Sequence, residues 1–303
     1  MPAVKREGVR LTITGASAHD RHERREPPSQ AVLDVRPVGL CAPNLRLAED
    51  PRTLPFLVNK FLRLLAKRTP FVEDEILGLD AVVRPGDVCL DIGAEYGIYS
   101  HALACLVGPG GTVHSIEPLP GAFRMLTAGL ALAGRRNVRC HQVALGEHAG
   151  HGTLSVPQRR GLPVHGRAFL TTGANGQGPN TEFTSSRAVV ADVLTLDGLC
   201  ARERIDRVDF VKADVEGAEF SVLRGGEATL AAHYPTLLFE IEERHVRKYG
   251  IDGASVVSWL TVRGYQMRIW RNGAWQATDQ VTAASRNYLL THPHRSFQRG
   301  WSG

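Results

Sequence analysis

The sequence VCLDIGAEYG at residues 88–97 is the strongest indication of how this chain folds. Its first five residues are apolar except for Asp91, which is typical of a strand buried inside a parallel sheet. Gly93 and Gly97 follow at once, and glycine lets the main chain turn tightly and approach a ligand closely. The pattern predicts a strand, a glycine turn and a helix whose N-terminus points toward a ligand.

Strand-like and helix-like segments alternate through the rest of the chain. Apolar runs predict further strands at 112–116, 138–143, 210–213 and 236–240, with a closing pair at 265–270 and 287–290. Residues at helical spacing predict helices at 97–106, 123–132, 196–199 and 255–262, and one that begins at 220. The order strand, helix, strand predicts an α/β fold with a doubly wound, mostly parallel sheet covered by helices.

Composition divides the chain into a central domain with additions. Residues 1–30 are polar and charged and end in EPPSQ, and the next 20 are broken by prolines, which predicts a partly disordered N-terminal arm. The segment 146–187 is rich in Gly, Pro, Ser, Thr and Asn, with strand-like pieces at 153–156 and 187–191. We therefore expect an arm at 1–50, a helical extension at 51–84 that includes a helix at 54–68, a main domain at 85–292 with a glycine-rich insert at 146–187, and a C-terminal tail at 293–303.

Apolar runs, cysteine spacing and net charge argue against several classes of protein. The longest apolar run falls short of the ~20 residues that span a bilayer, and residues 1–30 lack a secretory signal. The five cysteines are scattered without a CxxC pair, so we expect neither a zinc site nor a disulfide framework, and a cytoplasmic location. The net charge of +5 is interpreted as a solvated surface with a mobile tail, because no aromatic residues interleave the basic clusters, and no nucleic-acid partner is expected.

An acid at the end of the second strand pairs with the glycine turn. Glu117 lies 20 residues after Gly97, where a carboxylate can accept both hydroxyls of a ribose. A dinucleotide site would present its turn to a pyrophosphate, which Asp91 would repel. A cationic nucleoside would be attracted instead, and S-adenosylmethionine carries a sulfonium and an ammonium but no phosphate. The pair therefore favours S-adenosylmethionine over NAD or ATP.

A second acidic motif, FVKADVEGAE at 210–219, follows the fourth strand. Asp214, Glu216 and Glu219 should reach the same sheet edge as the glycine turn, and Lys212 should offset one of their charges. Crowded acids need a cation, a metal or substrate donors nearby. Alternatively Asp214 caps a helix whose first turn holds the other acids, and both interpretations can hold together.

These motifs resemble the FkbM-type methyltransferases, whose hallmark is K-x-D-x-E-G-x-E. The similarity extends over about residues 72–292 and includes LDIGA at 90–94, Glu117-Pro118, VALG at 143–146, TLD at 195–197 and NYL at 287–289. The resemblance implies a seven-stranded, Rossmann-like class I fold and S-adenosylmethionine as donor. It implies an acceptor oxygen, a hydroxyl or carboxyl, on a small molecule such as a secondary metabolite or a sugar. Relatives usually carry Asn where this chain has Glu95.

The candidate site residues follow from both lines of reasoning. Those expected to bind the cofactor are Asp91, Gly93, Ala94, Glu95, Tyr96, Gly97, Glu117, Pro118, Val143, Ala144 and Asp214. Those expected to act on the acceptor are Asp214, Glu216, Glu240 and His245, with His245 placed on a solvated helix among charged residues. A divalent metal held by Asp214 and Glu216 is an alternative that we do not expect. The rival functions are a nucleic-acid methyltransferase, an NAD-dependent enzyme and a non-catalytic S-adenosylmethionine-binding module, and a homodimer is left open.

Overall fold

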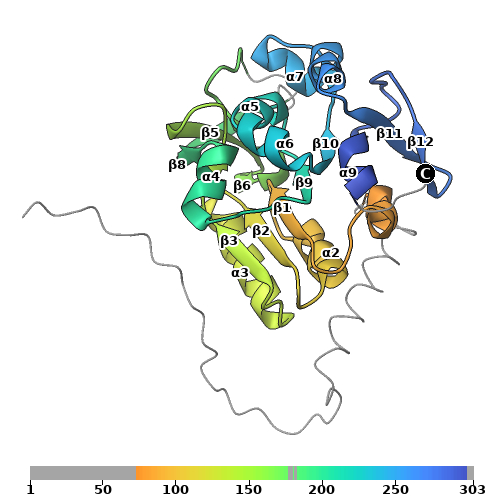
Figure 1. Cartoon of the computed structure of the whole chain (residues 1–303). Coiled ribbons are helices and arrows are strands. Elements are labelled where there is room, and N and C mark those ends of the chain that lie inside the picture. The colour runs from red at the N-terminus through yellow and green to blue at the C-terminus, as the bar shows by residue number, and fades with distance from the viewer. Residues whose placement is uncertain (1–72, 177–179, 181–182, 299–303) are drawn as a thin grey trace, which may run out of the picture. The chain divides into compact units, whose positions relative to one another are not determined.

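The computed structural model describes residues 73–176, 180 and 183–298 of the chain (Figure 1). The predicted N-terminal arm and the predicted helix at 54–68 lie outside these residues, as do the first part of the helical extension and the last five residues of the tail. Within the described residues, no helix combines the length and the apolar character that crossing a membrane requires.

The main sheet of the described chain has eight strands in the order β12-β11-β13-β10-β9-β1-β2-β3. The bounds are β1 (Val88–Ile92), β2 (Thr112–Ile116), β3 (Val138–His141), β9 (Phe210–Ala213), β10 (Thr236–Glu240), β11 (Gln266–Arg271), β12 (Ala274–Ala277) and β13 (Asn287–Thr291). The pairs among β3, β2, β1, β9 and β10 are all parallel, and β13 is antiparallel to both β10 and β11. The predicted doubly wound α/β class is confirmed.

The expected count of seven strands is one too low, because β12 extends the sheet beyond β11. The turn between these strands is Asn272-Gly273, and both residues have positive φ, +52° and +77°. An Asn-Gly pair in this conformation forms the tight two-residue turn that joins antiparallel strands. The dipeptide was the local signal for the eighth strand.

Helices cover both faces of the main sheet (Figure 1). On one face lie η1 (Asp74–Ala81), a 3₁₀ helix, and α2 (Ile98–Val107), packed on Cys89, Phe210 and Leu238. Neighbouring strand residues point the other way and pack under the second helical layer of α4 (Leu196–Glu203), α5 (Glu219–Arg224), α6 (Glu227–His233) and α8 (Gly253–Val262). Strands buried on both faces explain why the central runs are almost wholly apolar.

The remaining helices are short apart from α3 (Pro120–Leu132), which packs Leu126 and Leu130 near Ala94. They comprise η2 (His165–Arg167), α7 (Glu243–Val246), η4 (Arg247–Tyr249) and α9 (Pro293–Gln298). The predicted tail therefore begins as a helix, and Arg295 on α9 forms an ion pair of 2.8 Å with the buried Asp209.

A second, smaller sheet is built largely from the glycine-rich segment. Its described strands are β4 (Ala144–Leu145), β5 (Gly150–Arg159), β6 (Leu162–Pro163), β7 (Phe169–Leu170) and β8 (Ser185–Leu194). A long antiparallel ladder joins β5 to β8, from Gly150 opposite Val193 to Gln158 opposite Ser185. Both strand pieces expected at 153–156 and 187–191 lie in this ladder, and both strands run further than expected.

Candidate active site

A cleft lies at the carboxyl ends of β1, β2 and β9 and is covered by residues of the second sheet. It has about 740 Å³ of empty space, part of it open to solvent. Its lining comprises Ile92, Gly93, Glu95, Ile116, Glu117, Pro118, Leu119, Val143, Ala144, Leu145, Leu154, His165, Gly166, Ala168, Phe169, Leu170, Asp214, Val215, Glu216 and Ala218. Ligands of open α/β sheets bind at this edge, where the strand order reverses.

The glycine turn after β1 joins the two sequence motifs. Gly93 has a φ of +77°, and a β-carbon there would lie 1.9 Å from the carbonyl oxygen of Asp214. The amides of Gly93 and Ala94 donate to the carbonyl of Ile116 at 2.9 and 3.0 Å. The turn can therefore cross the end of β2 and touch the loop after β9 only if residue 93 is glycine.

Asp91 does not face the cleft, although we expected it beside a cationic ligand. Its side chain alternates with those of Leu90 and Ile92 along β1 and points toward α2, where the Ser100 hydroxyl donates to it at 2.5 Å. Burial raises the pKa of Asp91 to about 6. Ala94, Tyr96 and Gly97 are likewise outside the lining, so the part of the predicted cofactor set that lines the cleft is Gly93, Glu95, Glu117, Pro118, Val143, Ala144 and Asp214.

Glu117 follows β2 and lies in the cleft wall with 5% of its surface exposed. One carboxylate oxygen accepts from the amide of Glu95 at 3.0 Å and the other from the amide of Leu119 at 2.8 Å. Burial raises the pKa of Glu117 to about 7, and these two amides partly oppose the shift. The carboxylate is thus held in one orientation in the wall of the cleft.

Glu95 connects the glycine turn to the second sheet. Its backbone is left-handed, with a φ of +46°, which is uncommon for a residue other than glycine. Burial raises the pKa of Glu95, while the amide of Gly166 in η2 donates to its carboxylate and lowers it. The neighbouring Tyr96 hydroxyl lies 3.0 Å from Nδ1 of His165. Glu95 therefore contacts the segment that covers the cleft.

The loop after β9 concentrates carboxylates around one buried lysine. Lys212 is 1% exposed, and its Nζ lies 3.5 Å from Asp214, as the sequence predicted. Burial alone would lower the pKa of Lys212, but Asp214 and the other nearby acids raise it overall. Glu219 is also buried, and it accepts from the amides of Val215 at 2.8 Å and Gly217 at 3.3 Å.

These contacts separate the two alternatives for the acidic motif. Helix α5 begins at Glu219, its N-cap is Ala218, and no side chain caps it. Asp214 is therefore not the helix cap, and the capping alternative is wrong for this residue. Glu219 instead stabilises the loop that carries Asp214 and Glu216 into the cleft.

His245 is buried, which corrects the expectation of a solvated helix. It lies on α7 with 2% of its surface exposed, directly against Gly217, where a β-carbon would come within 2.4 Å of its carbonyl oxygen. Gly217, with a φ of +99°, makes this close approach possible. Only this face of the short helix turns inward, and the charged neighbours that dominate its sequence, such as Arg244, Arg247 and Glu243, are more exposed.

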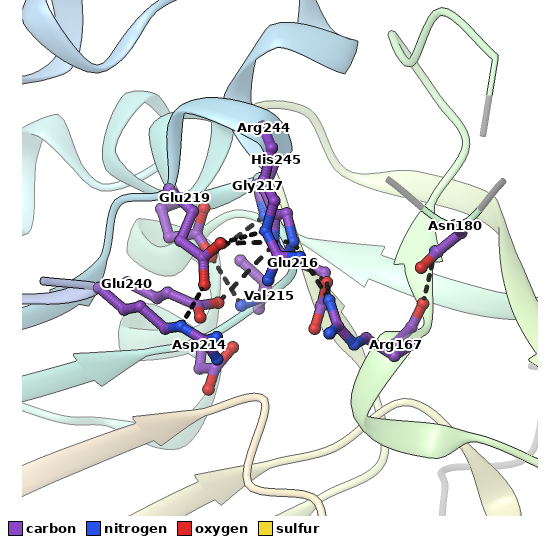
Figure 2. Close-up of polar contacts among 12 residues, drawn as sticks. Arg167, Asn180, Asp214, Val215, Glu216, Gly217, Glu219, Glu240, Arg244 and His245 are labelled. Atoms are coloured by element: carbon purple, nitrogen blue, oxygen red, sulfur yellow. Dashed lines mark hydrogen bonds and ion pairs between the residues drawn. The ribbon is translucent and has the colours of Figure 1, made fainter. Parts of the chain in front are cut away.

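Glu216, Glu240 and His245 gather at the end of the cleft (Figure 2). Nδ1 of His245 lies 3.0 Å from Glu216 Oε2 and 3.9 Å from Glu240 Oε2. Burial raises the pKa of Glu216 to about 8, with Asp214 adding to the effect. Burial and the same Asp214 raise the pKa of Glu240, and burial lowers the pKa of His245 to about 4. Glu216 is the member of this group that lines the cleft, and its φ of +55° marks a strained backbone at that point.

Two basic residues near this group were missed by sequence reasoning. Nη1 of Arg167, on η2, lies 3.3 Å from Nε2 of His245 and 3.9 Å from Glu216 Oε2. The buried Lys248 lies over the ring of Phe169, 4.0 Å from its centre. No local pattern marked them, because Arg167 belongs to the glycine-rich segment and Lys248 to a stretch of mixed charge.

The cleft fits S-adenosylmethionine by the chemistry of its side chains. Within the described lining there are four carboxylates, on Glu95, Glu117, Asp214 and Glu216, and neither lysine nor arginine. Such a surface attracts a sulfonium and an ammonium and repels a pyrophosphate. Apolar side chains at the ends of β1 and β2 and in β4 form the remaining wall, which suits the planar base of a nucleoside.

A protein family and several known proteins resemble parts of this chain. A family model described as the methyltransferase FkbM domain matches residues 91–267. The chain is 29% identical over 222 residues to the 31-O-demethyl-FK506 methyltransferase FkbM of Streptomyces tacrolimicus, covering 67% of this chain and 82% of that protein. It is also 29% identical over 142 residues to Methyltransferase 1 of Beauveria bassiana, covering 45% of this chain and 57% of that protein.

Among solved structures, the chain resembles a methyltransferase FkbM from Methylobacillus flagellatus KT at 18% identity and a TM-score of 0.42. That match covers 70% of this chain and about half, 49%, of the other. The family match carries the assignment, because it extends over more than half of the 303 residues. This chain belongs to the FkbM family of S-adenosylmethionine-dependent methyltransferases.

Proposed function

We propose that the protein is an O-methyltransferase that acts on a hydroxyl or carboxyl group of a small molecule, such as a secondary metabolite or a sugar. The name of the Streptomyces relative gives 31-O-demethyl-FK506 as its acceptor, which supports an oxygen acceptor and a role in natural-product biosynthesis. We also propose a cytoplasmic location, because the cysteines that the structure describes are thiols, as a reducing compartment would keep them.

Different residues of the cleft would contact different parts of the cofactor. Glu117 would accept the ribose hydroxyls, Val143 and Ala144 would contact the base, and Glu95 and Asp214 would face the cationic end. When bound, S-adenosylmethionine supplies a methyl group, whose carbon–sulfur bond breaks with its electron pair left on sulfur as the acceptor oxygen bonds to carbon. The protein contributes by holding the two partners in line and by excluding water. The segment 165–170 over the cleft serves the second purpose.

The position of Glu216 carries the proposal. It lies in the lining next to Asp214, with Glu240 and His245 behind it, so side chains that can form hydrogen bonds are concentrated at one end of the cleft (Figure 2). A hydroxyl acceptor must be oriented by such groups before its oxygen can react. Amine-methylating classes place an Asn/Asp-Pro-Pro-aromatic run after the fourth strand, and this chain has Asp214-Val215-Glu216-Gly217 there.

The test is a transfer assay with deuteromethyl-labelled S-adenosylmethionine and a panel of hydroxylated and carboxylated small molecules, read by mass spectrometry. We expect label on oxygen, and we expect Glu216→Gln to lower turnover by roughly 10²-fold while cofactor affinity stays within about twofold. Glu227→Gln is the matched control, because Glu227 is 44% exposed and pairs with Arg224 and Arg263 on the surface. Label found on nitrogen would overturn the proposal.

The rival nucleic-acid function has its own test. The sequence pI of about 9.1 favours binding to RNA, but the described cleft lining contains no lysine or arginine to contact a phosphate backbone. We expect no salt-dependent retention of the protein on immobilised RNA. Retention that weakens steeply with salt, together with methylation of the bound RNA, would replace the small-molecule acceptor.

A further inference from the structure

We infer that Glu216, Glu240 and His245 form a binding site for a divalent cation at the acceptor end of the cleft. One ligand-type atom from each residue lies within 4.8 Å of the other two. All three residues are buried, with exposed fractions of 7%, 7% and 2%. The role given to the ion below rests on the proposed O-methyltransferase function.

The three atoms lack ordinary partners. Oε2 of Glu216, Oε2 of Glu240 and Nδ1 of His245 have no hydrogen-bond partner among the described residues. The 3.0 Å approach of Nδ1 to Glu216 satisfies neither atom, because its geometry is not that of a hydrogen bond. Leaving a buried polar atom without a partner is unfavourable, so three such atoms close to one another indicate a missing shared partner. A cation would satisfy all three.

A second group of acids nearby is less suited to hold an ion. Asp214, Glu219 and Glu240 also lie within ligand distance of one another. Asp214 is already paired with Lys212 at 3.5 Å, and Glu219 uses one oxygen to accept from two backbone amides. Glu216 Oε2 has only the longer 3.9 Å approach of Arg167, and neither this oxygen nor Nδ1 of His245 takes part in a hydrogen bond, so the ion belongs between them and Glu240.

The donor set indicates the class of ion. One imidazole nitrogen and two carboxylate oxygens suit Mn²⁺ or Zn²⁺ better than Mg²⁺, which prefers oxygen ligands and keeps its waters. Three protein ligands leave coordination positions open, as in catalytic metal sites. Because Glu216 lines the cleft, the open positions face the acceptor.

The ion would promote ionisation of the acceptor hydroxyl. A hydroxyl oxygen bound to a divalent cation has a lowered pKa, as metal-bound water does. Its O–H bond breaks, the electron pair stays on the oxygen, and the proton leaves to solvent through the open part of the cleft. The bound oxyanion is then the nucleophile, and no side chain needs to act as a dedicated base.

Arg167 competes with the ion for His245, which gives the proposal a further test. Its Nη1 donates toward Nε2 of His245 at 3.3 Å, which requires the neutral ring to carry its proton on Nδ1. An ion on Nδ1 moves that proton to Nε2, where Glu242 Oε2 at 3.9 Å is a nearby acceptor. Arg167 must therefore give up this contact when the ion binds, and its removal should strengthen ion binding.

The test measures Mn²⁺ binding to the full chain after treatment with EDTA, without cofactor or acceptor. The free-ion electron paramagnetic resonance signal should report one bound Mn²⁺ per chain. We expect Glu240→Gln and His245→Gln each to weaken binding at least about tenfold, Glu227→Gln to leave it unchanged, and Arg167→Gln to tighten it. Near-ultraviolet circular dichroism and retained S-adenosylmethionine affinity establish that each variant is folded.

Two outcomes overturn the inference. The first is an absence of Mn²⁺ and Zn²⁺ binding by the wild-type chain. The second is equal Mn²⁺ affinity in wild type, Glu240→Gln and His245→Gln. The proposed function fails separately. Methyl transfer to oxygen that is undiminished after EDTA would keep that function and overturn the ion's role, whereas bound Mn²⁺ with label on nitrogen would keep the ion site and overturn the proposed function.

Discussion

Gly93 is the residue at which the two sequence motifs meet. Its position after β1 could be predicted, because a glycine turn needs no information beyond the local run of residues. Its contact with the carbonyl of Asp214, about 120 residues later in the chain, could not be predicted from spacing. The contact explains why an acidic loop and a glycine turn are found together in one cleft.

Replacing Gly93 tests this contact against backbone strain alone. Gly93→Ala should destabilise the protein by more than about 3 kcal/mol, because a left-handed φ and a backbone clash add together. Gly86→Ala is the control: Gly86 has a similar φ of +86°, but no atom lies within 4 Å of where its β-carbon would be. It should cost only about 1 kcal/mol in urea unfolding. Equal losses for the two variants would show that the contact with Asp214 is unimportant.

Glu117 should make cofactor binding depend on pH. Burial raises the pKa of Glu117 to about 7, and the ribose diol binds the ionised carboxylate better than the acid. The affinity for S-adenosylmethionine, measured by calorimetry, should therefore reach its maximum near pH 8 and fall about tenfold by pH 6. Glu117→Gln should bind more weakly at pH 8, by roughly tenfold or more, and show a flatter pH profile. Wild-type affinity in this variant would remove Glu117 from the cofactor site.

At the scale of elements, the second sheet decides what covers the cleft. Its core joins Leu154 and Leu170 of β5 and β7 to Leu119 and Ala122 at the start of α3. The strand pieces at 153–156 and 187–191 could be predicted from the sequence, but their pairing into one ladder could not. Register between strands depends on contacts across the ladder, which a single strand's sequence does not report.

Leu154 tests the attachment of the second sheet. Leu154 is 5% exposed and lines the cleft, so Leu154→Ala should cost about 2–5 kcal/mol of stability and weaken cofactor binding. The control is Val190→Ala on β8, because Val190 is 72% exposed and a change within about 0.5 kcal/mol is expected. Thermal unfolding and calorimetry measure the two effects. Identical behaviour of both variants would mean that the inner face of this sheet does not support the cleft.

At the scale of the whole molecule, buried carboxyl groups and buried histidines affect the pH dependence of stability in opposite directions. Burial raises the pKa of Glu75, Asp91 and Glu117 to about 7, 6 and 7. Burial also lowers the pKa of His101 and His114 to about 4 and 3. The carboxyls hold protons in the folded state that the unfolded chain has released, and the histidines do the opposite.

These shifts predict a loss of stability in mildly alkaline solution. The stabilising effect of the protonated carboxyls is complete below their unfolded pKa and is lost as pH rises through the folded value. The histidines oppose this trend only below about pH 6.5, where the unfolded chain binds their protons. The melting temperature of the cofactor-free protein should therefore fall from pH 6.5 to about pH 8, and Glu75→Gln should reduce that fall. A rising melting temperature over this interval would contradict the assigned directions.

The alternation of strands and helices, the glycine turn and the two acidic motifs could be predicted from the sequence, because each depends on residues that are neighbours along the chain. The eighth strand, which we did not expect, also had a local signal in Asn272-Gly273. The side of β1 on which Asp91 lies, the burial of His245 and the approach of Arg167 from η2 to Glu216 depend on the tertiary structure. Burial and charge pairing arise between segments far apart in the chain. The periodicity of a single segment does not indicate which other segments will pack against it.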